Sequence, residues 1–371
     1  MLLESSWKFY SKESILGIEL LNLSQNDQMK ILAFSKKGNL FFLSLDGLLI
    51  KKESVSENPI WTVKVFDIDN DGVLEIIVGG MDGILKVYKI QDTLLLDPYW
   101  THKFSSSISG ILIKDINNNG KTEVISYSLD KSIRVLDPTN GNLIWGQLFE
   151  DGIEDAIIWD IIESKSKQQI IACGNDGTIR DFALEKSDLL WFKRFSDKIR
   201  FINYINSNEG VFIICGGDDK QLHFIDGKTH EEIKTIQFKN YVWKGLSFPT
   251  SLHSSLLVSS YSFDYLENSQ PIQDITFSSK LICIDGNLEI VWELPNKNIE
   301  DIHPFQINHK NFIAVGTTQG ELLILDENNG SVRYTIKYSS CVNAIKYELK
   351  SNLLIICYED GLVEAFQIIN D

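Results

Sequence analysis

EIIVGGMDGILKVY, residues Glu75–Tyr88, contains two short apolar runs separated by a tight turn. Within the second run Leu85 and Val87 are two residues apart, which is the spacing of one face of a strand. Asp82-Gly83 between the runs suits a hairpin, because such pairs tolerate the positive φ that a tight turn needs. The stretch therefore predicts two antiparallel strands.

The same unit recurs along the whole chain, and successive copies start 41 to 57 residues apart. Seven copies align without a gap and begin at Lys30, Glu75, Glu123, Gln169, Phe212, Phe312 and Leu353. An eighth begins at Ser255 and resumes at Ser279 after an insertion. One position of the unit is aliphatic in every copy: Leu40, Leu85, Ile133, Ile179, Leu222, Leu281, Leu322 and Val363. Such a column indicates a buried stripe between packed sheets.

A period in the forties with short strands is typical of a β-propeller with one four-stranded blade per repeat. We therefore expect an all-β fold, a single eight-bladed propeller domain spanning residues 1–371. Its blades should start near residues 15, 60, 107, 153, 197, 241, 299 and 341. The last copy is followed by too few residues for an outer strand. We expect Leu2–Tyr10, with Trp7 where other outer strands carry Trp, to complete that blade beside residues 362–368.

Composition narrows the classes of partner. The net charge is −16, and no stripe of Lys and Arg is visible, which argues against nucleic acid. No apolar stretch approaches the length that spans a bilayer, so membrane insertion is not expected. The N-terminus has no basic or apolar region of a signal peptide, and the five cysteines are an odd number. A cytoplasmic protein with reduced thiols is expected.

The sharpest motif is the segment Asp67–Glu75, DIDNDGVLE, between the first and second strands of blade 2. Carboxylates at alternate positions with a glycine turn can surround a hard cation. Candidate Ca²⁺ ligands are the side chains of Asp67, Asp69, Asp71 and Glu75 and the carbonyl of Val73. The alternative is a turn in which the Asp side chains accept backbone N–H bonds without a metal.

DIDNDGVLEIIVGG resembles the FG-GAP or VCBS repeat of integrin α-subunit propellers, whose loops bind calcium. Blade 3 keeps the spacing from Asp115 to Glu123, but amides replace two acids, which implies much weaker affinity. Intracellular propellers of this kind belong to multi-subunit assemblies such as the Bardet–Biedl trafficking coat and the KICSTOR complex. The resemblance implies a subunit of such an assembly.

LDPTNGNLIW, from Leu136 to Trp145, is similar to the quinoprotein-like repeat, which also builds eight-bladed propellers. That family includes pyrroloquinoline-quinone dehydrogenases and non-enzymatic scaffolds. The enzymes carry a vicinal disulfide against the cofactor, whereas this sequence has no adjacent cysteines. The catalytic role is therefore not implied, and the Trp residues are expected to pack between blades.

The insertion in blade 6 is the best candidate for partner binding. It lies between the second and third strands and carries the apolar residues Phe263, Tyr265, Leu266, Ile272, Ile275 and Phe277. Such a loop either folds back on its blade or meets a partner. Trp61 and Trp243, in first strands, are further candidates for which core packing is the simpler role.

These observations favour a non-enzymatic cytosolic scaffold that binds other proteins, because a propeller is a platform whose activity depends on sites placed on it. No cofactor other than Ca²⁺ is suggested by the residues. The alternative is a ligand- or metal-binding, quinoprotein-like enzyme that uses the central channel.

Overall fold

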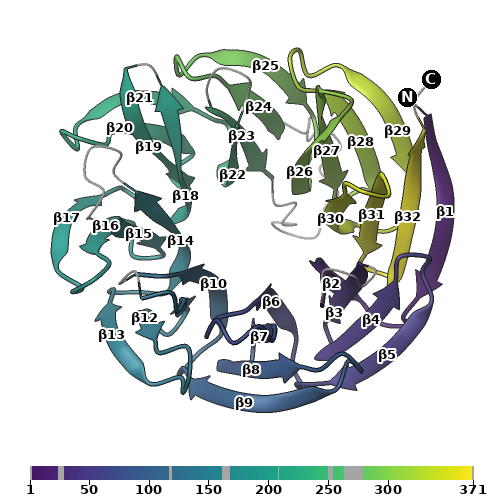
Figure 1. Ribbon diagram of the computed structural model, residues 1–371. Helices are drawn as coiled ribbons and strands as arrows, with labels where there is room; N and C mark the ends of the chain where they lie inside the picture. The colour runs from purple at the N-terminus through teal and green to yellow at the C-terminus, as the bar shows by residue number, and fades with distance from the viewer. Residues whose placement is uncertain are drawn as a thin grey trace, which may run out of the picture.

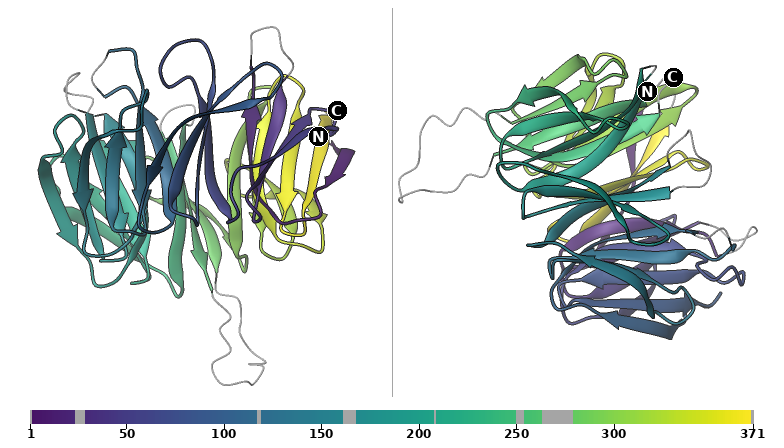
Figure 2. Two further views of the ribbon diagram at one scale, coloured as in Figure 1. Left: turned by 90° about the horizontal axis from the view of Figure 1, so that it is seen from below. Right: turned by 90° about the vertical axis from the view of Figure 1, so that its left-hand side faces the viewer.

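The computed structural model describes residues 2–23, 29–116, 119–160, 168–207, 209–249, 254–262 and 279–369, without the side chain of Asp160. Eight antiparallel sheets of four strands each are arranged as blades around one axis (Figure 1). The expected all-β, eight-bladed propeller is confirmed. Strands A to D of each blade follow one another outward from the axis, and in side view they run along it (Figure 2).

The first four blades follow directly from the repeat. Blade 1 consists of β2 (Ile15–Leu21), β3 (Lys30–Ser35), β4 (Asn39–Ser44) and β5 (Leu49–Ser54). Blade 2 consists of β6 (Ile60–Phe66), β7 (Glu75–Gly80), β8 (Ile84–Ile90) and β9 (Leu96–Lys103). Blade 3 consists of β10 (Ile108–Lys114), β11 (Glu123–Ser128), β12 (Ser132–Leu136) and β13 (Leu143–Leu148). Blade 4 consists of β14 (Ile153–Asp160), β15 (Gln168–Gly174), β16 (Thr178–Ala183) and β17 (Leu189–Arg194).

The second half has the same order until the last blade. Blade 5 consists of β18 (Ile199–Ser207), β19 (Gly210–Gly217), β20 (Gln221–Asp226) and β21 (Glu232–Gln237). Blade 6 consists of β22 (Tyr241–Pro249), β23 (Ser254–Tyr261), β24 (Lys280–Ile284) and β25 (Ile290–Pro295). Blade 7 consists of β26 (Ile299–Ile307), β27 (Lys310–Thr317), β28 (Glu321–Asp326) and β29 (Val332–Lys337). Blade 8 consists of β30 (Val342–Glu348), β31 (Leu353–Tyr358), β32 (Leu362–Ile369) and β1 (Leu2–Tyr10).

The N-terminal strand closes the ring, as expected. β1 pairs antiparallel with β32, from Leu2 opposite Ile369 to Tyr10 opposite Leu362. The Ser5 hydroxyl donates to Glu364 at 2.6 Å, and Lys8 forms an ion pair with the same carboxylate at 3.2 Å. The two ends of the chain therefore share one sheet.

The aliphatic column predicted from the repeats is the core of the blade interfaces. Its eight members are at most 1% exposed, because each lies between the sheet that carries it and a neighbouring sheet: Leu40, Leu85, Ile133, Ile179, Leu222, Leu281, Leu322 and Val363. Burial of this apolar surface is the main force that holds the blades together.

Tryptophans on four of the outer strands connect their blade to the next one. The indole N–H donates to a carbonyl in the turn between strands C and D of the next blade, at 2.6 to 2.8 Å: Trp7 to Leu45, Trp100 to Pro138, Trp145 to Leu184 and Trp292 to Glu327. Gly141, at φ +70°, lies against the Trp100 ring, where a Cβ atom would approach within 2.4 Å. These residues serve packing, as the sequence predicted.

A second inter-blade contact joins an Asp–Arg ion pair of one blade to a Phe ring of the preceding blade. It was missed in the sequence because its residues belong to two different repeats. Asp130, in the turn between strands B and C of blade 3, forms an ion pair with Arg134 at 2.9 Å. The guanidinium lies 4.3 Å from the ring centre of Phe104, which directly follows the outer strand of blade 2. Blade 4 repeats the arrangement with other residues of the same types: Asp176, Arg180 and Phe149.

The five cysteines are free thiols, and all except the half-buried Cys341 are buried. No helix in the described part of the chain is long and apolar enough to cross a membrane.

Candidate functional site

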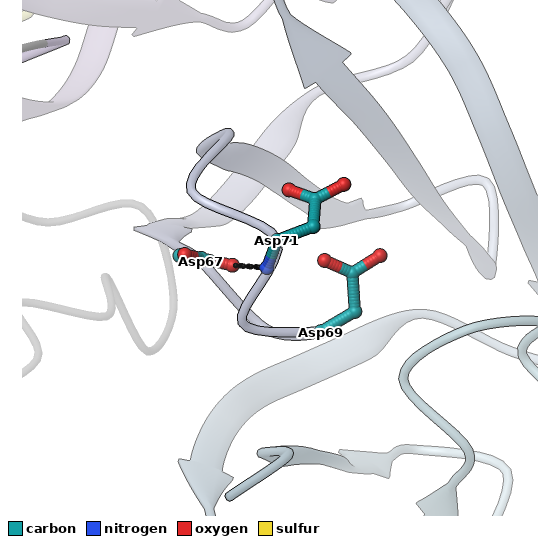
Figure 3. A group of neighbouring side chains, drawn as sticks. All are labelled: Asp67, Asp69 and Asp71. Atoms are coloured by element: carbon teal, nitrogen blue, oxygen red, sulfur yellow. Dashed lines mark hydrogen bonds between the residues drawn. The ribbon is translucent and has the colours of Figure 1, made fainter.

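The loop between β6 and β7 is held by its own side chains (Figure 3). The Asp67 carboxylate accepts the backbone N–H groups of Asp71 at 3.1 Å and Gly72 at 2.9 Å. Asp71 accepts the N–H of Val73 at 2.8 Å. Oxygens of Asp67, Asp69 and Asp71 nevertheless lie within 4.8 Å of one another. The loop combines the two arrangements that the sequence left open, an Asx-type turn and a carboxylate cluster.

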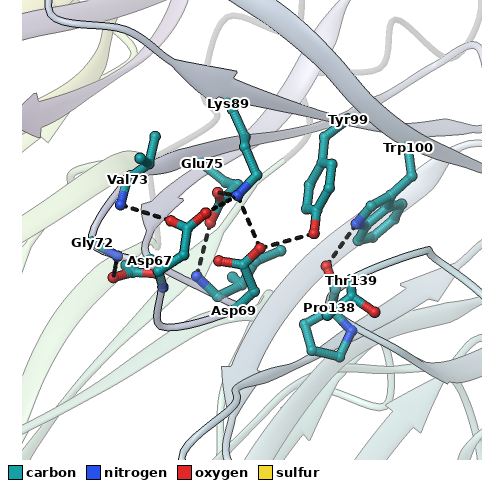
Figure 4. A network of polar contacts seen from close by, with 12 residues as sticks. Asp67, Asp69, Gly72, Val73, Glu75, Lys89, Tyr99, Trp100, Pro138 and Thr139 are labelled. Carbon is teal, nitrogen blue, oxygen red and sulfur yellow. Dashed lines mark hydrogen bonds and ion pairs between the residues drawn. The ribbon is translucent and has the colours of Figure 1, made fainter.

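Lys89, on β8, extends its ammonium group into this cluster (Figure 4). It forms ion pairs with Asp69 at 2.9 Å, with Asp71, and with Glu75 at 3.4 Å. The Tyr99 hydroxyl, on β9, donates to Asp69 at 2.8 Å. The cluster therefore already contains one positive charge from its own blade.

Glu75 faces inward. Its side chain is fully buried, and Oε2 accepts the N–H of Ile68 at 2.9 Å. Burial raises the pKa of Glu75 to about 7, against the opposing effects of that hydrogen bond and of Lys89. The Glu75 carboxyl therefore gains or loses its proton near neutral pH. Any cation shared with Asp69 would favour its ionised form.

The charges of Lys89 and Asp71 stabilise each other. The hydrogen bond from Lys89 lowers the pKa of the Asp71 carboxyl. Burial alone would lower the pKa of Lys89, but its bonds to Asp71 and Asp69 outweigh burial and raise it. Both groups are therefore charged across the physiological pH range.

The equivalent loop of blade 3 has the same backbone pattern. Asp115 accepts the N–H groups of Asn119 at 3.2 Å and Gly120 at 2.9 Å, and Glu123 accepts that of Ile116 at 3.0 Å. Asp137 occupies the position that Lys89 has in blade 2. Two loops with different charges thus share one turn geometry, so the turn itself does not require a cation.

Partner binding by the blade 6 insertion stays a prediction. Phe263, Tyr265, Leu266, Ile272 and Phe277 lie outside the described residues, in the connection between β23 and β24.

The two tryptophans of the first strands differ from each other. Trp61 is 42% exposed, so it is not a core residue. Trp243 is half-buried, 5.1 Å from Tyr261 between ring centres, and the Arg200 guanidinium lies 4.4 Å from its ring. Both lie at the bulge of a first strand, Trp61 between Ile60 and Thr62 and Trp243 between Val242 and Lys244.

Comparison with known proteins places the chain among β-propeller repeat proteins. A family model described as the lambda-carrageenase β-propeller domain matches residues 139–255. The BBSome complex member BBS2 of Rattus norvegicus is 27% identical over 116 residues, which is 31% of this chain and 15% of that protein. BBS2 of Danio rerio is 26% identical over 110 residues, 30% of this chain and 15% of that protein.

Two solved structures share the fold along the chain. Sqt1 of Saccharomyces cerevisiae superposes with a TM-score of 0.76 at 9% identity, covering 100% of both chains. BamB of Moraxella catarrhalis superposes with a TM-score of 0.65 at 15% identity, covering 99% of this chain and 100% of its own. At these identities the likeness concerns the fold alone.

Proposed function

We propose that the chain is a non-enzymatic platform for protein–protein interaction and works as one subunit of a cytoplasmic multi-protein assembly. The observation that carries this proposal is that the repeated positions and the turns of the ring differ in burial and in variability. The repeated positions are buried between blades, whereas the turns differ from blade to blade and offer distinct surfaces. The partial similarity to BBS2, a protein named as a member of a complex, supports a subunit role. Five free cysteines support a reducing compartment.

The test is purification of the tagged full chain from its native cells, followed by mass spectrometry and size determination. We expect stoichiometric partner proteins in a complex larger than the 42.3 kDa chain. Recovery of the chain alone, from lysates prepared at low salt, would contradict the proposal. Fractionation of the same cells tests the cytoplasmic location.

A second candidate function is binding of a divalent cation, preferentially Ca²⁺, at the Asp67, Asp69 and Asp71 cluster. It is favoured by Asp69 Oδ1, which is buried and receives no hydrogen bond from the described residues. The donors are hard oxygens that suit calcium. Val73 and Glu75, which complete the ligand set expected from the sequence, belong to the same loop. A cation would have to displace Lys89 or share the carboxylates with it.

Calorimetric titration with CaCl₂ tests this second function. We expect binding that Asp69→Asn abolishes and that Asp115→Asn, a change at an acid of the corresponding loop in blade 3, leaves unchanged. Equal heats for the two variants would rule out the blade 2 cluster as the site.

A further inference from the structure

A hollow of about 510 Å³ opens between blades 6 and 7. It lies at the A–B turns, on the same side of the ring as the Asp67 loop of blade 2 but several blades away from it. Its volume is within the range of pockets that hold small ligands or single side chains. Its principal lining residues are Phe248, Pro249, Pro304, Phe305, Phe312 and Glu327.

The apolar wall is fixed by the sheets. Phe248, the next-to-last residue of β22, is 7% exposed, and Phe305, on β26, is 6% exposed. Phe305 lies opposite Phe312 in the β26–β27 ladder, with ring centres 5.8 Å apart and an interplanar angle of 30°. Because these rings belong to the packed cores of two blade interfaces, the wall is formed before any ligand arrives.

One carboxylate lies beside this aromatic wall. Glu327, in the turn between β28 and β29, is 8% exposed and forms no ion pair within the described part of the chain. Its backbone carbonyl accepts the indole N–H of Trp292 at 2.7 Å, which fixes the turn. Burial raises the pKa of Glu327, while a hydrogen bond from Asn311 lowers it. The neighbouring Asp326 is already paired, with Arg333 at 2.8 Å.

An aromatic wall beside a buried carboxylate favours a planar cation as the ligand of the hollow. Aromatic faces attract cations, and a buried carboxylate without a counter-ion gains most from a group that brings both charge and donors. A guanidinium satisfies both requirements, because it stacks on rings and donates two parallel N–H bonds to a carboxylate. The net charge of −16 also favours a basic partner over an acidic one.

We propose that this hollow receives an arginine side chain of a partner protein, with the guanidinium stacked on the Phe wall and hydrogen-bonded to Glu327. The inference rests on the proposed function as an interaction platform and names the kind of partner segment, a basic one. Gln306, His309 and Asn311 form a polar rim around the entrance, where backbone groups of an extended segment find hydrogen-bond partners.

The direct test uses two blocked amino acids that differ in charge and hardly in shape. Binding of N-acetyl-arginine methylamide and N-acetyl-citrulline methylamide to the full chain is compared by saturation-transfer NMR. We expect the arginine probe to bind about tenfold more tightly, because a hydrogen bond to a charged group is stronger than one between neutral groups. Equal affinities for the two probes would overturn the inference.

Two variants locate the binding. Glu327→Gln keeps the shape and the backbone bond to Trp292, and should reduce arginine binding about tenfold. Glu185→Gln is the matched control, an exposed acid in the equivalent turn of blade 4, and should change nothing. Phe312→Leu removes an aromatic ring from the half-buried edge of the wall, and it should also weaken arginine binding. Arginine binding that survives both Glu327→Gln and Phe312→Leu places the site elsewhere and refutes the inference.

The same variants separate this inference from the proposed function. If proteins co-purify with the wild-type chain and with Glu327→Gln equally, the platform role stands and the arginine pocket fails. If the arginine probe binds in the hollow but no protein co-purifies, the pocket chemistry holds and the platform role fails. Loss of a co-purified partner in Glu327→Gln, with an unchanged melting temperature, supports both.

Discussion

Asp181 and Trp191 lie opposite each other on β16 and β17, and the side chain of Asp181 is completely buried. Burial raises the pKa of Asp181 to about 7, and the indole of Trp191 lowers it only in part. The aligned residues of the other blades are apolar: Phe42, Val87, Val135, Phe224, Cys283, Ile324 and Ala365. Trp191 instead stacks on His230 of blade 5, with ring centres 4.5 Å apart.

This carboxyl makes the stability of the ring depend on pH. Since its pKa is higher in the folded than in the unfolded chain, the folded chain holds the proton over a range where the unfolded chain has lost it. The free energy of unfolding should therefore fall as the pH rises from about 4 to about 7. The loss amounts to roughly 2 to 4 kcal/mol, at about 1.4 kcal/mol per pKa unit. Urea titrations at pH 5 and pH 8 measure it.

Asp181→Val should remove this part of the pH dependence and stabilise the ring at pH 8, because valine is the residue of blades 2 and 3 at this position. Asp176→Ala, at an acid of the same blade whose partner is Arg180, should instead destabilise. If Asp181→Val were no more stable than the wild type at pH 8, burial of the Asp181 carboxyl would not lower the free energy of unfolding.

Replacing Lys89 by Met should destabilise blade 2 by roughly 2 kcal/mol above pH 7, because the buried Glu75 loses its counter-ion. The loss should shrink at pH 5, where Glu75 is protonated. Lys86→Met is the control, since Lys86 pairs with Asp82 at the other end of the same strand. Thermal denaturation with and without CaCl₂ measures both the pH effect and the calcium effect, and calcium should raise the stability of Lys89→Met more than that of Lys86→Met. A loss independent of pH would contradict the role given to Glu75.

Gly141→Ala tests the contact between outer strands and the next blade. We expect a loss of roughly 2 to 4 kcal/mol, because alanine brings both an unfavourable φ and a clash with the Trp100 ring. Gly72→Ala has a similar φ, +87°, but no atom within 4 Å of the added Cβ. It should cost only about 1 kcal/mol. Equal losses in denaturant titrations would mean that φ alone, not packing, explains the glycine.

Removal of residues 2–10 should lower the melting temperature by roughly 5 to 10 °C, because blade 8 loses its outer strand and Trp7 its bond to Leu45. Trp7→Phe keeps the strand and removes only the indole N–H, so it should cost much less. Unchanged melting of the truncated chain would show that the closure is unnecessary.

The sequence predicts most of the fold because the repeat places one aliphatic column and one turn in each copy. It also locates the Asp67 loop, since nine consecutive residues form it. Lys89 was missed, although a signal exists. Among the seven gapless copies, the blade 2 copy is alone in having a basic residue at this position. The hollow beside Glu327 leaves no such trace, because its walls come from separate strands of two blades that only the folded ring brings together.

The pairing of Leu2 with Ile369 has a consequence for synthesis on the ribosome. β1 is synthesised long before β32, so it stays without its neighbour while the intervening strands form. Long-range pairing of this kind is slow, and an apolar edge left open meanwhile invites contact with other chains. Closure of the ring thus requires β1, an early segment, to dock onto β32, a late one. We expect newly made protein to require protection from such contacts until β32 has emerged from the ribosome.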